Sequence, residues 1–214
     1  MNNRKSSNVK TKNDDAPPTR GVRLAEDADL TTIKISNKST TKGVAGAIAH
    51  LARDNRAVDV LAGSASALNV AVKATAVARV YLNADAPDCG LAASMSMNDG
   101  RKTVSLKLVI FDAKHIDDET PDNATLTVAS KTDSGALAGA IAARVREGKP
   151  VKLSAVGAGS VLRAVTSVAL ATRYVSENFP NGLAILPTFE KTGGEDPSAG
   201  ASISILKLIV KPIA

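Results

Sequence analysis

The hexapeptide Val44-Ala-Gly-Ala-Ile-Ala49 recurs 93 residues later as Leu137-Ala-Gly-Ala-Ile-Ala142. When residues 33–81 are paired with residues 126–174 in this frame, 15 of 49 positions are identical and no gap is needed. A gapless match that crosses several predicted elements indicates a repeated structural unit. The 214-residue chain is therefore predicted to hold two copies of one small fold.

The segments outside the repeat differ from it in composition. The first twelve residues include four basic residues and no acidic one, whereas residues 115–123 carry four carboxylates and Pro121. Such stretches are typical of tails and linkers. The ends of the two copies correspond with a shifted offset, so that Leu106–Phe111 matches Leu206–Lys211. The sequence predicts four segments: a flexible basic tail at 1–29, a first domain at 30–114, an acidic linker at 115–123 and a second domain at 124–214.

Each copy is predicted to fold in the order β-α-β-α-β-β, which makes the chain an α+β protein. Alternating apolar residues predict the strands, and apolar residues at helical spacing predict the helices. Asn98-Asp-Gly-Arg101 is a strong hairpin signal. Gly63–Ser66 and Gly157–Ser160 are predicted as tight turns before the second helices. Strands are expected at 32–36, 58–62, 91–97, 104–111, 126–129, 151–155, 183–189 and 202–210, and the second helices at 67–81 and 161–174.

The composition excludes several classes of function. Two tyrosines and three phenylalanines are the only aromatic residues. These are too few for base stacking by a single-strand binder or an RRM sheet, and most are expected in the core. Cys89 alone cannot form an internal disulfide or a cysteine zinc cage. No apolar run reaches the ~18 residues that span a bilayer, and no secretory signal is recognised. The protein is expected in the bacterial cytoplasm, or in the host cytoplasm if a phage encodes it.

Motifs in both copies carry a resemblance to a known family. They are Ile33–Ser36, Val44–Ala47, Ala67–Ala74 and Ala76–Arg79 in the first copy, and Leu137–Ala140, Gly157–Gly159, Ala164–Val165 and Leu206–Pro212 in the second. Each copy resembles the stage V sporulation protein S family, which is related in fold to the Alba nucleic-acid-binding proteins. The first copy has Ser64-Ala-Ser66 where the family has Gly-Ala-Gly, and the second has Thr166 in place of Lys73.

The resemblance to Alba-like domains implies nucleic-acid binding through the loop after the first strand, the start of the second helix and the last hairpin. Loop lysines beside helix N-termini suit phosphate, because free N–H groups and the helix dipole favour an anion. A solvated surface also explains any single basic residue. The candidates are Lys38, Lys42, Lys73, Arg79, Arg101 and Lys102 in the first copy, and Lys131, Arg163, Arg173 and Lys191 in the second.

No local motif predicts catalysis, a metal site or a cofactor. Gly157–Ser160 lacks the Lys-Ser/Thr of a Walker A loop, and a strand-to-helix turn is the favoured interpretation. His50 and His115 have no partner nearby in sequence, and the acidic linker lacks the glycine and final glutamate of a calcium loop.

The sequence as a whole favours a non-enzymatic nucleic-acid-binding protein. The net charge is +6, and the two domains carry 11 basic against six acidic residues and ten against six. Phosphate contacts give little sequence preference, and RNA is slightly favoured over DNA as the partner. The alternative is a structural, assembly or regulatory adaptor protein that oligomerises. The family is usually a single domain, so the two copies are also candidates for an intramolecular pseudo-dimer.

Overall fold

The computed structural model describes residues 31–82, 87–98, 101–111, 125–190 and 205–213. The predicted basic tail, the acidic linker and Lys191 lie outside these residues. The first copy holds β1 (Thr31–Ile35), α1 (Thr41–Arg53), β2 (Val58–Ala62), α2 (Ala65–Tyr81), β3 (Asp88–Asn98) and β4 (Arg101–Phe111). The second copy holds β5 (Thr125–Val128), α3 (Ser134–Arg146), β6 (Val151–Ala155), α4 (Gly157–Tyr174), β7 (Leu183–Glu190) and β8 (Ile205–Pro212). The predicted α+β class and element order are confirmed.

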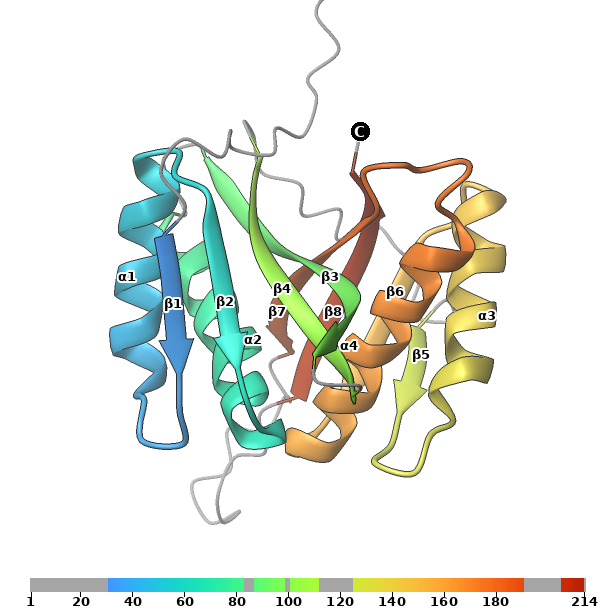
Figure 1. Cartoon of the computed structure of the whole chain (residues 1–214), viewed down its shortest axis with the longest axis horizontal. Coiled ribbons are helices and arrows are strands. Elements are labelled where there is room, and N and C mark those ends of the chain that lie inside the picture. The colour runs from blue at the N-terminus through green and yellow to red at the C-terminus, as the bar shows by residue number, and fades with distance from the viewer. Residues whose placement is uncertain (1–30, 83–86, 99–100, 112–124, 191–204, 214) are drawn as a thin grey trace, which may run out of the picture.

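The two copies share one eight-stranded sheet in the order β1-β2-β4-β3-β7-β8-β6-β5. Each copy contributes four adjacent strands, and the copies meet where β3 pairs antiparallel with β7. The second copy therefore repeats the first in reverse order across the sheet, as a two-fold axis between β3 and β7 requires. Twist accumulates over eight strands, so the outer strands β1 and β5 point toward the same edge of the molecule (Figure 1).

Small side chains on the second helices let the two copies pack closely. α2 has a buried alanine face, with Ala67, Ala71, Ala74 and Ala78 each at most 1% exposed. α2 packs against α4 as well as against α1, and α3 packs against α4. An alanine surface allows helix backbones to approach, and the main core between helices and sheet is consequently continuous through both copies.

The junction is held by one buried ion pair and by matching cross-copy hydrogen bonds. Arg79 donates from Nε and Nη2 to the Asp88 carboxylate, both at 2.8 Å, and from Nη1 to the Pro187 carbonyl of the other copy at 3.0 Å. Its repeat equivalent, Thr172, shares its one hydroxyl hydrogen between the Ala93 carbonyl of the other copy at 3.2 Å and the Val168 carbonyl of its own helix at 3.1 Å. The same repeat position thus ties each copy to a strand of the other.

The first helices end in the same way in both copies. Asn55 and Gly148 occupy equivalent positions just beyond α1 and α3, with φ of 52° and 65°. A left-handed residue there is a common helix terminator, and glycine adopts it without strain. The chain is thereby turned toward β2 and β6.

Two identities of the repeat form one conserved contact. Arg53 Nη2 donates to the Tyr81 carbonyl at 3.0 Å, and Arg146 Nη2 donates to the Tyr174 carbonyl. A guanidinium at the C-terminus of the second helix binds a carbonyl that has no partner within the helix and offsets the negative end of the helix dipole. The contact explains why the arginine recurs at the 93-residue spacing, whereas the tyrosine supplies only its backbone carbonyl.

The tyrosine rings themselves are not core. Tyr81 and Tyr174 are 45% and 47% exposed and Phe189 is 38% exposed, whereas Phe111 is 1% exposed. The expectation that most aromatic residues lie in the core is therefore wrong. The two tyrosines lie in the last turn of their helices, where the backbone carbonyl makes the contact and the ring projects outward.

We expect Arg53→Ala to lower the free energy of unfolding by about 1 kcal/mol, because one partly exposed hydrogen bond and a favourable dipole contact are lost. Urea denaturation followed by circular dichroism measures the change. Lys42→Ala, which removes an exposed cation from the first turn of the same helix, serves as the comparison. A loss at Arg53 no larger than experimental error contradicts the capping role.

The sheet register corrects the predicted match of the carboxyl ends. Val60 pairs with Leu106, and its repeat equivalent Leu153 pairs with Leu208. Leu106 therefore corresponds to Leu208 rather than to Leu206. The predicted match, which was based on the similar Leu-Lys-Leu runs, was therefore two residues out of register. A shift of two residues keeps the same side chains on the core face, because side chains alternate along a strand, so the apolar pattern did not reveal the error.

The glycine-rich segment of the second copy also differs from its prediction. Gly157 has a φ of +80° and opens α4, so Gly157–Ser160 forms the first turn of the helix instead of a turn before it. The predicted hairpin is confirmed, with Asn98 paired to Arg101. Among the described residues, no helix is long and apolar enough to cross a membrane.

Cys89 is buried at the start of β3. Burial, with the Asp88 charge adding to it, raises the pKa of its thiol to about 12. Because the thiolate is the reactive form, we expect the native thiol at pH 8 to react with Ellman's reagent on the order of 1,000-fold more slowly than the urea-unfolded thiol.

The same pKa sets a pH dependence. The unfolded thiol loses its proton near pH 8.5 and the folded thiol only near 12, so the stabilisation from Cys89 is present below pH 8.5 and is lost as pH rises toward 12. Comparison with Cys89→Ala isolates this contribution from other titrating groups. Rapid, stoichiometric labelling of native protein contradicts the burial of the thiol.

Candidate functional site

Four loops and four helix N-termini gather at one edge of the molecule. β1 and β2 are parallel, so the loops 36–40 and 63–64 that follow them lie side by side, and β5 and β6 place 129–133 and Val156 in the same way. Figure 1 shows these loops, with the first turns of all four helices, along the lower edge of the molecule. We call these loops, together with the first two turns of the four helices, the loop edge.

Short polar contacts set the shape of the loop edge. The Ser64 hydroxyl donates to Asn37 Oδ1 at 2.8 Å, joining the two loops of the first copy. In the second copy Arg163 Nε donates to the Ser130 carbonyl at 3.2 Å. A Cβ on Gly159 would lie 2.9 Å from the Ser130 Cβ, so glycine lets the start of α4 approach that loop. Each copy thus fixes its first loop against its second helix by different residues.

Three of the four helices begin with a side-chain cap. Thr40, Ser64 and Asp133 accept hydrogen bonds from the backbone N–H groups of Gly43, Ala67 and Ala136. α4 begins after Val156, whose side chain cannot cap, and it shows no side-chain cap hydrogen bond. The caps hold the loops against the helix starts. They also satisfy first-turn backbone N–H groups that would otherwise hydrogen-bond to solvent or to a ligand.

The loop edge brings together four of the ten candidate residues. Lys38 and Lys131 are exposed at equivalent places, three residues after β1 and β5. Lys42 is exposed in the first turn of α1, and Arg163 is exposed in the second turn of α4. Asp133 adds one exposed carboxylate beside Lys131. Among the residues of this edge whose side chains the structure describes, the loops and the helix starts carry four cations against one anion.

Three other candidates lie elsewhere. Arg79 is 3% exposed and holds the buried ion pair, so it is unavailable to a ligand, and its assignment to a nucleic-acid site is withdrawn. Lys73 is half-buried in the middle of α2. Arg173 is exposed, but it lies in the last turn of α4, about 15 Å along the helix axis from Arg163.

The remaining candidates are placed only by their strands. Because β4 runs antiparallel to β2, Arg101 and Lys102 at the start of β4 lie at the end of the sheet where β2 finishes, which is the loop edge. Lys191 follows β7 directly and lies outside the described residues.

The opposite edge is also basic, for a structural reason. Arg53, Arg144, Arg146 and Arg173 lie in the last turns of α1, α3 and α4, where cations offset the helix dipoles. Lys149 pairs with Glu147 at 2.6 Å and, through that hydrogen bond and its charge, lowers the pKa of Glu147. The positions of these cations are therefore explained by the helix C-termini they stabilise and by the neighbouring acid, without a ligand.

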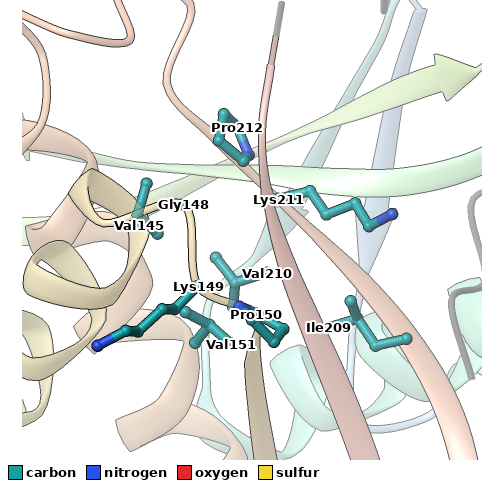
Figure 2. Close-up of a pocket in the computed structure, with 9 residues that line it drawn as sticks. All are labelled: Val145, Gly148, Lys149, Pro150, Val151, Ile209, Val210, Lys211 and Pro212. Atoms are coloured by element: carbon teal, nitrogen blue, oxygen red, sulfur yellow. The ribbon is translucent and has the colours of Figure 1, made fainter. Parts of the chain in front are cut away.

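A pocket of about 380 Å³ opens at this opposite edge, between the end of α3 and the end of β8. Val145, Pro150 and Pro212 give it apolar walls. Figure 2 shows the amino groups of Lys149 and Lys211 pointing in opposite directions, so the pocket has no convergent pair of cations. Among the described residues, no three His, Cys, Asp or Glu side chains group as metal ligands.

Sequence reasoning missed the structural role of Arg79, although a signal for it exists. Leu68, Val72, Thr75 and Arg79 follow each other at helical spacing, and all four are buried. An arginine that continues a buried stripe needs a buried acid. Asp88 comes nine residues later, beyond the end of the helix, so no local spacing rule connects the pair.

The fold and the loop edge together define a fused pair of β-α-β-α-β-β units with matching basic loops. The family model for Stage V sporulation protein S (SpoVS) matches residues 31–110 and again 124–211. The chain belongs to this family and carries it as two tandem copies.

Proposed function

We propose that this protein is a non-enzymatic nucleic-acid-binding protein that holds the phosphate backbone along the loop edge. The observation that carries the proposal is the recurrence of an exposed lysine, Lys38 and Lys131, at equivalent places of both copies, with Lys42 and Arg163 on the same edge. The resemblance in fold to Alba-like domains points to the same loops.

The composition of this edge favours backbone contacts over base readout. Lysine and arginine bind phosphate by charge and release condensed counterions, which gives affinity without sequence preference. Tyr81 and Tyr174 lie at the opposite edge, and Phe189 is the one exposed aromatic side chain among the described residues at the end of the sheet where β6 finishes, too few for stacking along a strand. RNA is slightly favoured over DNA, and the proposed site of action is the cytoplasm.

Fluorescence anisotropy with labelled RNA and DNA of mixed sequence tests the proposal. If about four phosphates are contacted, raising the salt concentration from 50 to 200 mM should weaken binding roughly 100-fold, with little difference between sequences. Binding of neither polymer at 50 mM salt rejects the proposal. Affinity that does not change with salt rejects its mechanism.

The strongest rival is an assembly or adaptor protein. Its structural support is that, within the described sheet, β1 and β5 pair on one side only, and edge strands can add further strands. Light scattering of the protein without nucleic acid separates the two proposals. Concentration-dependent oligomers together with no retention of either polymer favour the rival.

A further inference from the structure

We propose that the two basic loops form one bivalent site, bridged by a single nucleic-acid segment about one helical turn long. This inference rests on the proposed function and deepens it, since it names the ligand as a polymer that must reach both copies. Mononucleotides and short oligonucleotides should then bind weakly, because they occupy one half only. The first half-site is Lys38 with Lys42, and the second is Lys131 with Arg163.

The junction between the copies fixes the relative position of the half-sites. β3 and β7 join the two sets of strands into one sheet, and α2 packs directly on α4. The buried Arg79 side chain bonds Asp88 in its own copy and Pro187 in the other. Two rigidly joined half-sites need no reorganisation when one ligand binds both, so little affinity is lost to ordering.

The sheet also sets the distance that a ligand must span. Lys38 follows β1 and Lys131 follows β5, and these are the two outermost strands of the eight-stranded sheet. Seven inter-strand spacings of about 4.8 Å separate these two strands by about 34 Å across the sheet. One turn of duplex DNA is about 34–36 Å, or roughly 10 base pairs. A duplex of that length returns the same strand to the same face at both half-sites.

Bivalent binding has a recognisable dependence on ligand length. When a ligand is too short to span, the half-sites act independently, and affinity rises only slowly with the number of phosphates. Once it spans them, the second contact becomes intramolecular and affinity rises by a further factor of about 10 to 100. The length at which this rise occurs reports the separation of the half-sites.

The test is a length series on the full chain. Blunt duplexes of DNA and of RNA, in steps from 4 to 20 base pairs, are titrated at 50 mM salt by anisotropy. We expect affinity to increase at least about tenfold between duplexes shorter and longer than one turn, in whichever series binds. We expect Lys38→Glu with Lys42→Glu to reduce this step to less than about threefold. A glutamate in the first turn of α1 suits the helix dipole, so this variant should fold.

Lys149→Glu with Arg173→Glu is the matched control, since it makes the same charge change at the opposite edge and should keep the step. Binding that rises smoothly with length overturns the bivalent site and leaves the proposed function standing. If the double variant Lys38→Glu/Lys42→Glu keeps the increase in affinity at one turn, the bivalent site is likewise overturned and the proposed function stands. Absence of binding at every length overturns both.

Discussion

The variant Arg79→Met is expected to lose about 3–5 kcal/mol of unfolding free energy, because it leaves the Asp88 carboxylate buried without its partner. Asp88 is 1% exposed and lies where β3 begins, next to the junction of the two copies. The Pro187 carbonyl also loses a hydrogen bond. For a protein of this size the loss corresponds to a fall in melting temperature on the order of 10 °C. Urea denaturation and thermal melting measure it.

The double variant Arg79→Met with Asp88→Asn is the control, because it removes both charges and keeps an acceptor for the Cys89 N–H group. We expect it to recover a substantial part of the lost stability, since the largest cost is the unpaired charge. Folded Arg79→Met protein should bind nucleic acid as wild type does. A loss of stability under about 1 kcal/mol, with the double variant no better than the single, contradicts the structural role.

Charge reversal at the equivalent loop lysines, Lys38→Glu with Lys131→Glu, is expected to weaken nucleic-acid binding on the order of 100-fold at 50 mM salt. Both side chains are exposed on loops after edge strands. The reversal removes two phosphate contacts and adds two repulsive charges to the loop edge. Anisotropy with one labelled RNA and one labelled DNA measures the change, and circular dichroism confirms that the variant folds.

Lys149→Glu with Arg173→Glu again gives the same change in net charge at the opposite edge. We expect it to weaken binding by less than about threefold, through long-range charge alone. If both double variants lose affinity equally, binding depends on the net charge of the protein and not on the loop edge. If the opposite-edge variant loses more, the assignment of the site is wrong.

Much of the fold is readable from local sequence. The repeat of the Val44 hexapeptide predicted two copies, and alternation of apolar residues placed β2 and β6 at the bounds that the structure shows. Asn-Asp-Gly-Arg predicted the β3–β4 hairpin because few other turns suit that composition. Signals of this kind depend only on residues that are neighbours in the sequence, so the elements they predict can be assigned without the tertiary structure.

Features that depend on contacts across the chain were missed. The start of α4 was misplaced because glycine at 157 and 159 usually breaks a helix, yet Gly159 is needed where α4 approaches Ser130. Arg79 was taken for a surface cation because its partner lies beyond the helix. The union of the copies rests on short pairing between β3 and β7, and nothing in either strand alone specifies it.

The candidate site was partly predictable for the same reason. Lys38, Lys42 and Lys131 follow strands that parallel pairing brings to one edge, so their gathering follows from topology. The candidates on α2 and α4 were included because the start of the second helix of each copy was expected to face the ligand; they are Lys73, Arg79 and Arg173. Their actual places, in the middle and last turns, depend on where each helix begins and which face is buried.

The salt dependence of nucleic-acid affinity tests the central claim most directly. Association constants of wild type and of Lys38→Glu with Lys131→Glu are measured from 50 to 300 mM salt, and log K is plotted against log salt. The loop edge predicts a wild-type slope of about −3 to −4 and a slope shallower by about 2 in the variant. A wild-type slope near zero, or identical slopes for the two proteins, would contradict phosphate binding by these loops.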